Sequence, residues 1–232
     1  MSNNYGPRIV TDGLICCLDA ADLNSYPGTG NTWTDLSGNS KNGTIDAAVA
    51  YSSNQYSGAF LFDNTGDDEK ISLPKIITTT DFTVCQFINQ QQSVPTDVAS
   101  AEGWIFEQYE ANDGGRFIID TRTDARIRLF IGGTSVYSST TINNDQNYFI
   151  CCSRDTSSGS VGSIYVNGLL DNYGNIPSNT IANITCAIGG SRYFLSNKQF
   201  GGYIYTTHVY NRALKLEEIQ NNYNALKGRF GL

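Results

Sequence analysis

The C-terminal stretch, residues 201–232, restricts the fold more than any other part of the chain, because two different periodicities meet in it. Residues 201–210 (GGYIYTTHVY) carry bulky side chains at both odd and even positions, which predicts a β-strand that is buried on both faces. One face of this strand is expected to carry Tyr203, Tyr205, Thr207 and Val209. Such a strand belongs at the centre of a sheet.

The residues after this strand change to helical spacing. The apolar side chains that recur three or four residues apart are Leu216, Ile219, Tyr223 and Leu226. They predict one amphipathic helix over about residues 216–227, ended by Gly228 and docked on an edge or rim of a sheet. The residue before the helix is Lys215, which has no oxygen acceptor, so the capping box with Glu218 is expected to be incomplete at a cost of about 1 kcal/mol.

The rest of the chain has the composition of an all-β protein. Its 232 residues include 23 glycines, 40% hydrophobic residues and only 16% charged residues, which suits short strands joined by turns around a core. Two-residue turn signals at Gly132-Gly133 and Asn167-Gly168 predict two hairpins. We predict an N-terminal arm over residues 1–12 and a single antiparallel two-sheet jelly-roll sandwich over residues 13–232.

Charge and hydropathy exclude two kinds of partner. The net charge is −7, whereas binding to a phosphate backbone requires clustered lysines and arginines, so nucleic acid is not expected as a partner. No apolar run approaches the roughly 18 residues that a membrane-spanning helix needs. The N-terminal sequence also lacks the basic start and apolar core of a secretion signal.

The six cysteines are expected to stay reduced. Two pairs are neighbours within predicted strands, where successive side chains point to opposite faces, and the other two lie in apolar runs. Their spacing matches no zinc site. We therefore interpret all six as small buried side chains of a protein in a reducing compartment: Cys16, Cys17, Cys85, Cys151, Cys152 and Cys186.

Both ends of the chain carry motifs of one family. Residues 18–44 contain LDA, SYPG, WTDLSGN and NGT, and residues 209–219 read VYNRALKLEEI. Between them lie FDNTGDD at residues 62–68 and YVNG at residues 165–168. Together these motifs resemble the laminin-G-like, concanavalin A-like lectin and glucanase domains, in particular those of tailed-phage virion structural proteins.

The resemblance implies a function as well as a fold. It implies a non-enzymatic phage virion protein, a capsid decoration or surface-displayed module with weak glycan adhesion, located in the virion after assembly in the host cytoplasm. Its partners would be other virion proteins and cell-surface glycans, and self-association into a homo-oligomer stays open. The alternative is a carbohydrate-binding or glycan-cleaving module of a tail or host-recognition protein.

No residue pattern indicates a catalytic centre. Glycoside hydrolysis needs two carboxylates about 5 to 10 Å apart, and the nearest candidates are Glu107 and Glu110. Their separation of three predicts opposite faces of a strand, so we interpret them as solvated strand-end carboxylates. His208 lies within the C-terminal strand, and we interpret it as a hydrogen-bonded structural side chain. No catalytic residue is therefore assigned.

Two kinds of binding site are open alternatives. No cofactor is expected, with calcium as the one exception: the acidic turn of Asp67, Asp68 and Glu69 would supply oxygen ligands, although a simple charged turn is the favoured interpretation. Sugar binding would use exposed aromatic side chains, although most aromatics of such a core must be buried. The candidates are Tyr26, Trp33, Trp104, Tyr109, Tyr193 and Phe194. The sequence does not select a saccharide site among them.

Overall fold

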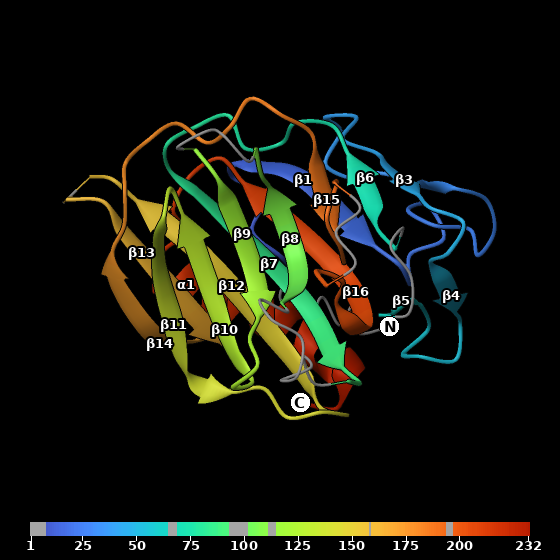
Figure 1. The fold of residues 1–232 in the computed structure, drawn as a ribbon. Coiled ribbons are helices and arrows are strands. Elements are labelled where there is room, and N and C mark those ends of the chain that lie inside the picture. Colours follow the sequence, from blue (N-terminus) through green and yellow to red (C-terminus); the bar gives the residue numbers. More distant parts are fainter. Residues whose placement is uncertain (1–7, 65–68, 93–101, 111–114, 158, 194–196) are drawn as a thin grey trace, which may run out of the picture.

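The computed structural model describes residues 8–64, 69–92, 102–110, 115–157, 159–193 and 197–232, which form two antiparallel sheets packed face to face (Figure 1). The first sheet contains, in spatial order, β14 (Leu169–Asn175), β13 (Val161–Val166), β12 (Asn147–Asp155), β7 (Phe82–Gln90), β16 (Gly201–Tyr210), β5 (Ala59–Asp63) and β4 (Ala50–Ser52), with β1 (Leu14–Asp19) also paired to β16. The second sheet contains β11 (Thr134–Thr141), β10 (Arg126–Ile131), β9 (Phe117–Thr121), β8 (Gly103–Gln108), β15 (Cys186–Ile188), β6 (Ile71–Leu73), β3 (Gly43–Ile45) and β2 (Thr32–Trp33). The predicted all-β two-sheet sandwich is confirmed.

A continuous apolar core fills the space between the two sheets. Phe82 of the first sheet packs edge-on against Phe117 of the second, with 4.8 Å between ring centroids. At the other end of the sandwich, Trp33 and Phe60 make the same kind of contact at 4.7 Å. These rings are fully buried together with many isoleucine, leucine and valine side chains, so burial of apolar side chains holds the sheets together.

The predicted hairpins are confirmed. The strands β10 and β11 pair across Gly132-Gly133, whose φ angles are 55° and 97°. The strands β13 and β14 pair across Asn167-Gly168, with φ angles of 50° and 80°. Left-handed backbone at both turn positions matches the twist of the adjoining strands, and glycine or asparagine adopts it at little cost.

The C-terminal helix covers a sheet face, not the predicted rim. Helix α1 (Leu216–Leu226), continued by the 3-10 turn η1 (Lys227–Phe230), lies behind the first sheet, on the side away from the second sheet (Figure 1). Phe230 stacks on Phe87 of the central strand β7 at 4.1 Å between centroids. The central strands carry large apolar side chains on this outer face too, and these need a cover that a rim position would not give. Leu216, predicted to lie on the apolar stripe, is 39% exposed.

The start of the helix has half of a capping box. As predicted, the Lys215 side chain caps no backbone group, but Glu218 accepts a hydrogen bond from the Lys215 N–H at 2.8 Å. The same carboxylate accepts two hydrogen bonds from Arg212, which lower the pKa of Glu218 to about 2. The ion pair with Arg212 therefore holds the helix start where the hydroxyl cap is missing.

The described part of the N-terminal arm, residues 8–12, docks on this helix. The Val10 N–H donates to the side-chain oxygen of buried Asn222 at 2.7 Å, and the Tyr210 hydroxyl donates to the Val10 carbonyl at 3.0 Å. Residues 8–12 and the C-terminal helix thus meet on the outer face of the first sheet.

The predicted faces of β16 are wrong in part. A bulge between Ile204 and Thr206 shifts the pairing of β16 with β7. Tyr203 and Tyr205 therefore pack toward the helix, whereas Val209 packs into the core between the sheets. The strand is buried along nearly all of its length, as predicted, but a simple alternation does not hold across the bulge.

The prediction of six reduced cysteines is also wrong, because Cys85 and Cys151 form a disulfide. These residues stand directly opposite each other on the paired strands β7 and β12, on the face that the helix covers. Sequence neighbours point to opposite faces, but residues on different strands share one. The other four cysteines are free and buried, as predicted. The disulfide removes the cysteine argument for a reducing compartment.

Candidate functional site

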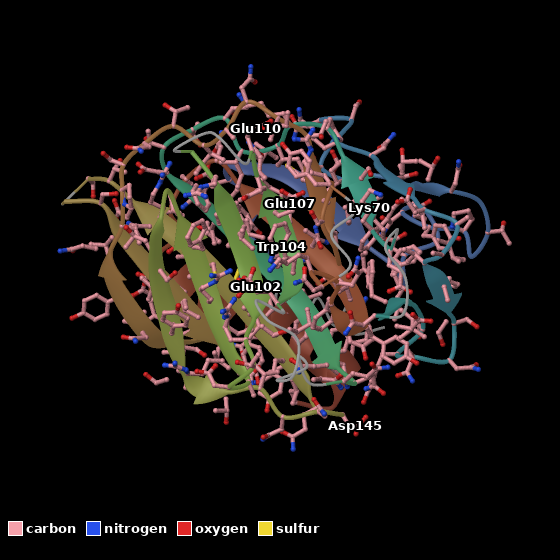
Figure 2. The ribbon with its side chains drawn as sticks, in the orientation of Figure 1. Lys70, Glu102, Trp104, Glu107, Glu110 and Asp145 are labelled. Atoms are coloured by element: carbon pink, nitrogen blue, oxygen red, sulfur yellow. A yellow bond between two sulfur atoms is a disulfide. The ribbon has the colours of Figure 1, made fainter. Side chains whose placement is uncertain are left out.

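A pocket of about 270 Å³ opens on the outer face of the second sheet, over β8, β9 and β10. We call it the front pocket. It is lined by Glu102, Trp104, Tyr109, Arg116, Ile118, Arg128, Phe130 and Lys198. The register of the strands brings these side chains together. Trp104 pairs with Asp120 and Asp120 with Arg128, and Ile118 pairs with Phe130 across adjacent strands. Figure 2 shows Glu102, just before β8, and Trp104, on β8, at the front of the molecule, with Glu107 and Glu110 farther along the chain.

Glu102 is the centre of the charged side chains in the front pocket. It accepts a hydrogen bond from the indole N–H of Trp104 at 2.6 Å. Its carboxylate also pairs with Arg128 at 3.0 Å, with Lys198 at 3.5 Å and with Arg122. Burial alone would raise the pKa of Glu102, but Arg128, the indole N–H and Lys198 together lower it below its usual range. Glu102 therefore stays ionised.

The floor of the pocket contains a buried ion pair. Asp120 is fully buried, and the guanidinium of Arg128 donates from Nε to both of its carboxylate oxygens at 3.1 Å. Burial raises the pKa of Asp120, and Arg128 acts against that rise. The contacts with Asp120 and Glu102 together hold the Arg128 side chain at the floor of the pocket.

Aromatic rings form one wall of the pocket. Trp104 is only 2% exposed and contacts Tyr109 at 5.3 Å between centroids, so the half-buried rings of Tyr109 and Phe130 present the accessible surface. The guanidinium carbon of Arg116 lies 6.0 Å from the centre of the Tyr109 ring and 5.4 Å from that of Phe130. The arrangement offers flat apolar surface next to fixed charge.

Glu107 and Glu110 do not lie as predicted. The strand β8 ends at Gln108, so alternation does not extend to Glu110, and both carboxylates contact Arg192. The Arg192 N–H donates to Glu107 at 3.0 Å, and the Tyr193 hydroxyl donates to Glu110 at 2.5 Å. Glu107 is not solvated but 0% exposed, and burial raises its pKa to about 8.

The other aromatic candidates divide into three groups. Trp33 and Tyr26 are buried in the core, where they pack against Phe60, so neither offers a platform. Trp104, Tyr109 and Tyr193 lie together, with Tyr109 6.0 Å from Tyr193 between ring centroids. Phe194 lies outside the described residues.

His208 is buried beneath the helix-side face of the first sheet. Burial lowers its pKa to about 4, so the imidazole is neutral at physiological pH. Its Nδ1 atom has no hydrogen-bond partner among the described residues, so the predicted hydrogen bond is absent at that atom. In the strand pairing the free Cys17 stands opposite His208, and burial raises the pKa of this thiol, so it is protonated and is not an activated nucleophile.

The proposed calcium turn is described only in part. Asp67 and Asp68 lie outside the described residues. Glu69 is buried and accepts a hydrogen bond from the Asn64 N–H at 2.8 Å, and burial raises its pKa to about 7. Within the described ranges no three acidic, histidine or cysteine side chains gather in a way that would hold a metal ion.

In the described ranges, too, no helix has the length and apolarity to cross a membrane.

Sequence reasoning named only two of the eight residues that line the front pocket, Trp104 and Tyr109. Arg116, Arg128, Phe130 and Lys198 were not among the candidates, although Arg128 and Phe130 alternate with apolar residues in RIRLFI. That alternation places one charged and one aromatic side chain on the outer face of β10, which is a detectable signal. Lys198 comes from a distant loop, and no local pattern points to it.

A family comparison classifies the chain. The concanavalin A-like lectin/glucanases superfamily, in its laminin G form, matches residues 63–220. The chain belongs to this superfamily, as the sequence motifs indicated. No curated protein matches the sequence.

Solved structures with the same fold include binding domains and an enzyme. The binding domain of Paraclostridial Mosquitocidal Protein 1 has a TM-score of 0.70 and 18% identity, covering 93% of this chain and 52% of that one. Domain 4 of AbnA, a GH43 extracellular arabinanase from Geobacillus stearothermophilus, was solved with arabinotriose; the TM-score is 0.68, the identity 19%, and the coverage 90% and 98%. Trypanosoma rangeli sialidase has a TM-score of 0.68 and 14% identity, covering 99% of this chain and 35% of the sialidase. This chain thus spans about half of the mosquitocidal domain and about a third of the sialidase.

Proposed function

We propose that this chain is a non-enzymatic structural protein of a phage virion, a capsid decoration or surface-displayed module, and that its front pocket binds glycans weakly. The observation that carries the binding proposal is the front pocket itself. It brings the half-exposed rings of Tyr109 and Phe130 next to fixed charged groups around Glu102. Sugars present apolar C–H faces that pack on aromatic rings and hydroxyl groups that pair with such polar side chains.

Two comparisons support a sugar ligand. The superfamily contains lectins, and domain 4 of the arabinanase, which shares this fold, was solved with arabinotriose. The pocket is shallow and small compared with ordinary ligand sites of several hundred Å³, so we expect dissociation constants of about 0.1 to 1 mM, typical of weak binding that many displayed copies strengthen.

The virion assignment rests on the two terminal motifs, which resemble those of tailed-phage structural proteins. The motif-bearing segments 18–44 and 209–219 lie far apart in the sequence, so a single short similarity does not account for both. Mass spectrometry and cryo-microscopy of purified phage particles test this assignment. Density for the sandwich on the capsid or tail supports it, and absence of the protein from the particle rejects it.

The absence of enzyme activity is proposed from the state of the two acidic candidates. Glu107 has no exposed surface, and Glu110 is engaged by Tyr193 and Arg192. A general acid and a nucleophile must both reach the glycosidic bond. Incubation with a panel of polysaccharides is expected to release no reducing ends. Cleavage that disappears in both Glu107→Gln and Glu110→Gln would establish the glycan-cleaving alternative instead.

Glycan binding is tested with pocket variants. Tyr109→Ala and Phe130→Ala each remove accessible aromatic surface, so each is expected to weaken binding on a glycan array and in calorimetry by about tenfold. Tyr173→Ala is the matched control, because Tyr173 is 64% exposed on β14 of the other sheet. Binding that survives both pocket variants, or that is lost equally in the control, contradicts the proposal.

A further inference from the structure

The front pocket has a surplus of positive charge in a chain whose net charge is −7. The described cations in and beside it are Arg116, Arg122, Arg128 and Lys198, and the described carboxylates are Glu102 and Asp120. Even with both acids ionised, the cations outnumber them by two. The neighbouring Arg192 and Glu110 pair with each other and leave the balance unchanged. The net charge of the pocket is thus positive, whereas the net charge of the whole protein is negative.

Both carboxylates are already engaged. Glu102 is shared by Arg122, Arg128 and Lys198, and Asp120 is held by Arg128. Arg116 forms no ion pair with any of the described residues, and its buried Nε atom has no hydrogen-bond partner among them. Arg116 as a whole is only half-buried and lines the pocket, so the accessible part of its guanidinium is within reach of an incoming anion.

The rings of Tyr109 and Phe130 fix the position of Arg116. The guanidinium lies within 6.0 Å of both ring centres, so it is held at the aromatic wall of the pocket. A ligand that packs on either ring therefore meets this cation. A planar guanidinium binds a carboxylate through two parallel hydrogen bonds, a geometry that a sugar hydroxyl does not reproduce.

We propose that the front pocket selects carboxylated sugars, such as sialates or hexuronates, with the sugar carboxylate on Arg116 and the sugar ring against Tyr109 or Phe130. This inference rests on the proposed glycan binding and specifies its ligand. A neutral sugar leaves Arg116 without an ion pair among the described residues, and an acidic sugar supplies one. The preference is electrostatic, so it decreases as salt concentration rises.

An array of paired glycans tests the selectivity. Each sialylated or uronate-containing glycan is printed beside its carboxyl-reduced counterpart, which has the same ring and linkage but no charge. The unmodified protein is expected to bind the acidic member at least tenfold more tightly, a difference of about 1.4 kcal/mol. Separate sialate and uronate arms show which carboxylated sugar is bound.

Two variants assign the selectivity to Arg116. Arg116→Gln is expected to bind both members of a pair equally, at the level of the neutral one. Arg126→Gln is the matched control: it changes the net charge equally, and Arg126 lies on β10 over the ring of Tyr137 and is not one of the residues that line the pocket. Thermal melting confirms that both variants fold. If Arg116→Gln does not fold, the comparison of paired glycans on the unmodified protein still decides whether the pocket prefers acidic sugars.

The outcomes separate the two proposals. Equal binding to both members of every pair, still lost in Tyr109→Ala, overturns the acidic-sugar inference and leaves glycan binding standing. An acid preference that persists in Arg116→Gln also overturns it. Binding to no glycan on the array overturns glycan binding itself, and the inference with it.

Discussion

At the scale of single residues, the burial of Glu107 makes the free energy of unfolding depend on pH. Its carboxyl group has a pKa of about 8 in the folded protein, because burial disfavours its charge, against about 4.5 when exposed. Between these values the folded state keeps a proton that the unfolded state releases. The free energy of unfolding therefore falls as pH rises from 4.5 to 8, by up to about 5 kcal/mol.

Glu107→Gln removes the group that causes this loss of stability at higher pH. The variant is expected to gain stability relative to the unmodified protein as pH rises from 4.5 to 8, because its amide has no proton to release. Urea unfolding at a series of pH values measures the difference. A difference that stays constant across this range would show that Glu107 is ionised in the folded protein.

His208 has the opposite dependence on pH. Burial lowers its pKa to about 4 from 6.5, so between these values the unfolded state binds a proton that the folded state does not. Stability is therefore lost as pH falls from 6.5 to 4, by at most about 3 kcal/mol. His208→Gln is expected to lose less stability than the unmodified protein over this range. If the free energy of unfolding changes equally with pH in the two proteins, the lowered pKa of His208 is disproved.

At the scale of elements, the disulfide between Cys85 and Cys151 ties two central strands beneath the helix. It joins residues 66 apart in sequence, so it restricts the unfolded chain strongly. The chain-entropy account gives about 4 kcal/mol for a loop of this length.

Removal of the disulfide is expected to lower the free energy of unfolding by about that amount. The double variant Cys85→Ala, Cys151→Ala tests this, and Cys152→Ala, a free buried cysteine on the same strand, controls for loss of side-chain volume. A reductant should destabilise the unmodified protein and leave the double variant unchanged. Equal sensitivity to reductant in both proteins would argue against the bond.

Elements with local signals were predictable from the sequence. The Gly132-Gly133 and Asn167-Gly168 turns and the helix each follow from residues close together in the chain. Features set by contacts between strands were not. The bulge in β16, the pairing of Cys85 with Cys151 and the end of β8 at Gln108 depend on register, which no short stretch of sequence encodes.

At the scale of the whole molecule, the two sheets differ in what the described residues place on their outer faces. Helix α1 and η1 pack on the outer face of the first sheet (Figure 1), together with the described part of the N-terminal arm. The front pocket lies on the outer face of the second sheet, where Figure 2 labels Glu102 and Trp104. The sequence predicted Trp104 and Tyr109 as candidates, but only the assembled sheet brings Arg116, Phe130 and Lys198 to them. A candidate site built from β8, β9, β10 and a distant loop can be recognised only when the fold is known.

The measurement that tests glycan binding at the front pocket most directly is an NMR titration of the labelled protein with sialylated and uronate oligosaccharides. Amide shifts are expected to change over β8, β9 and β10, around Tyr109, Arg116 and Phe130. Shifts confined to another surface, such as the pocket beside Leu169 and Leu170 at the edge of the first sheet, would contradict the account.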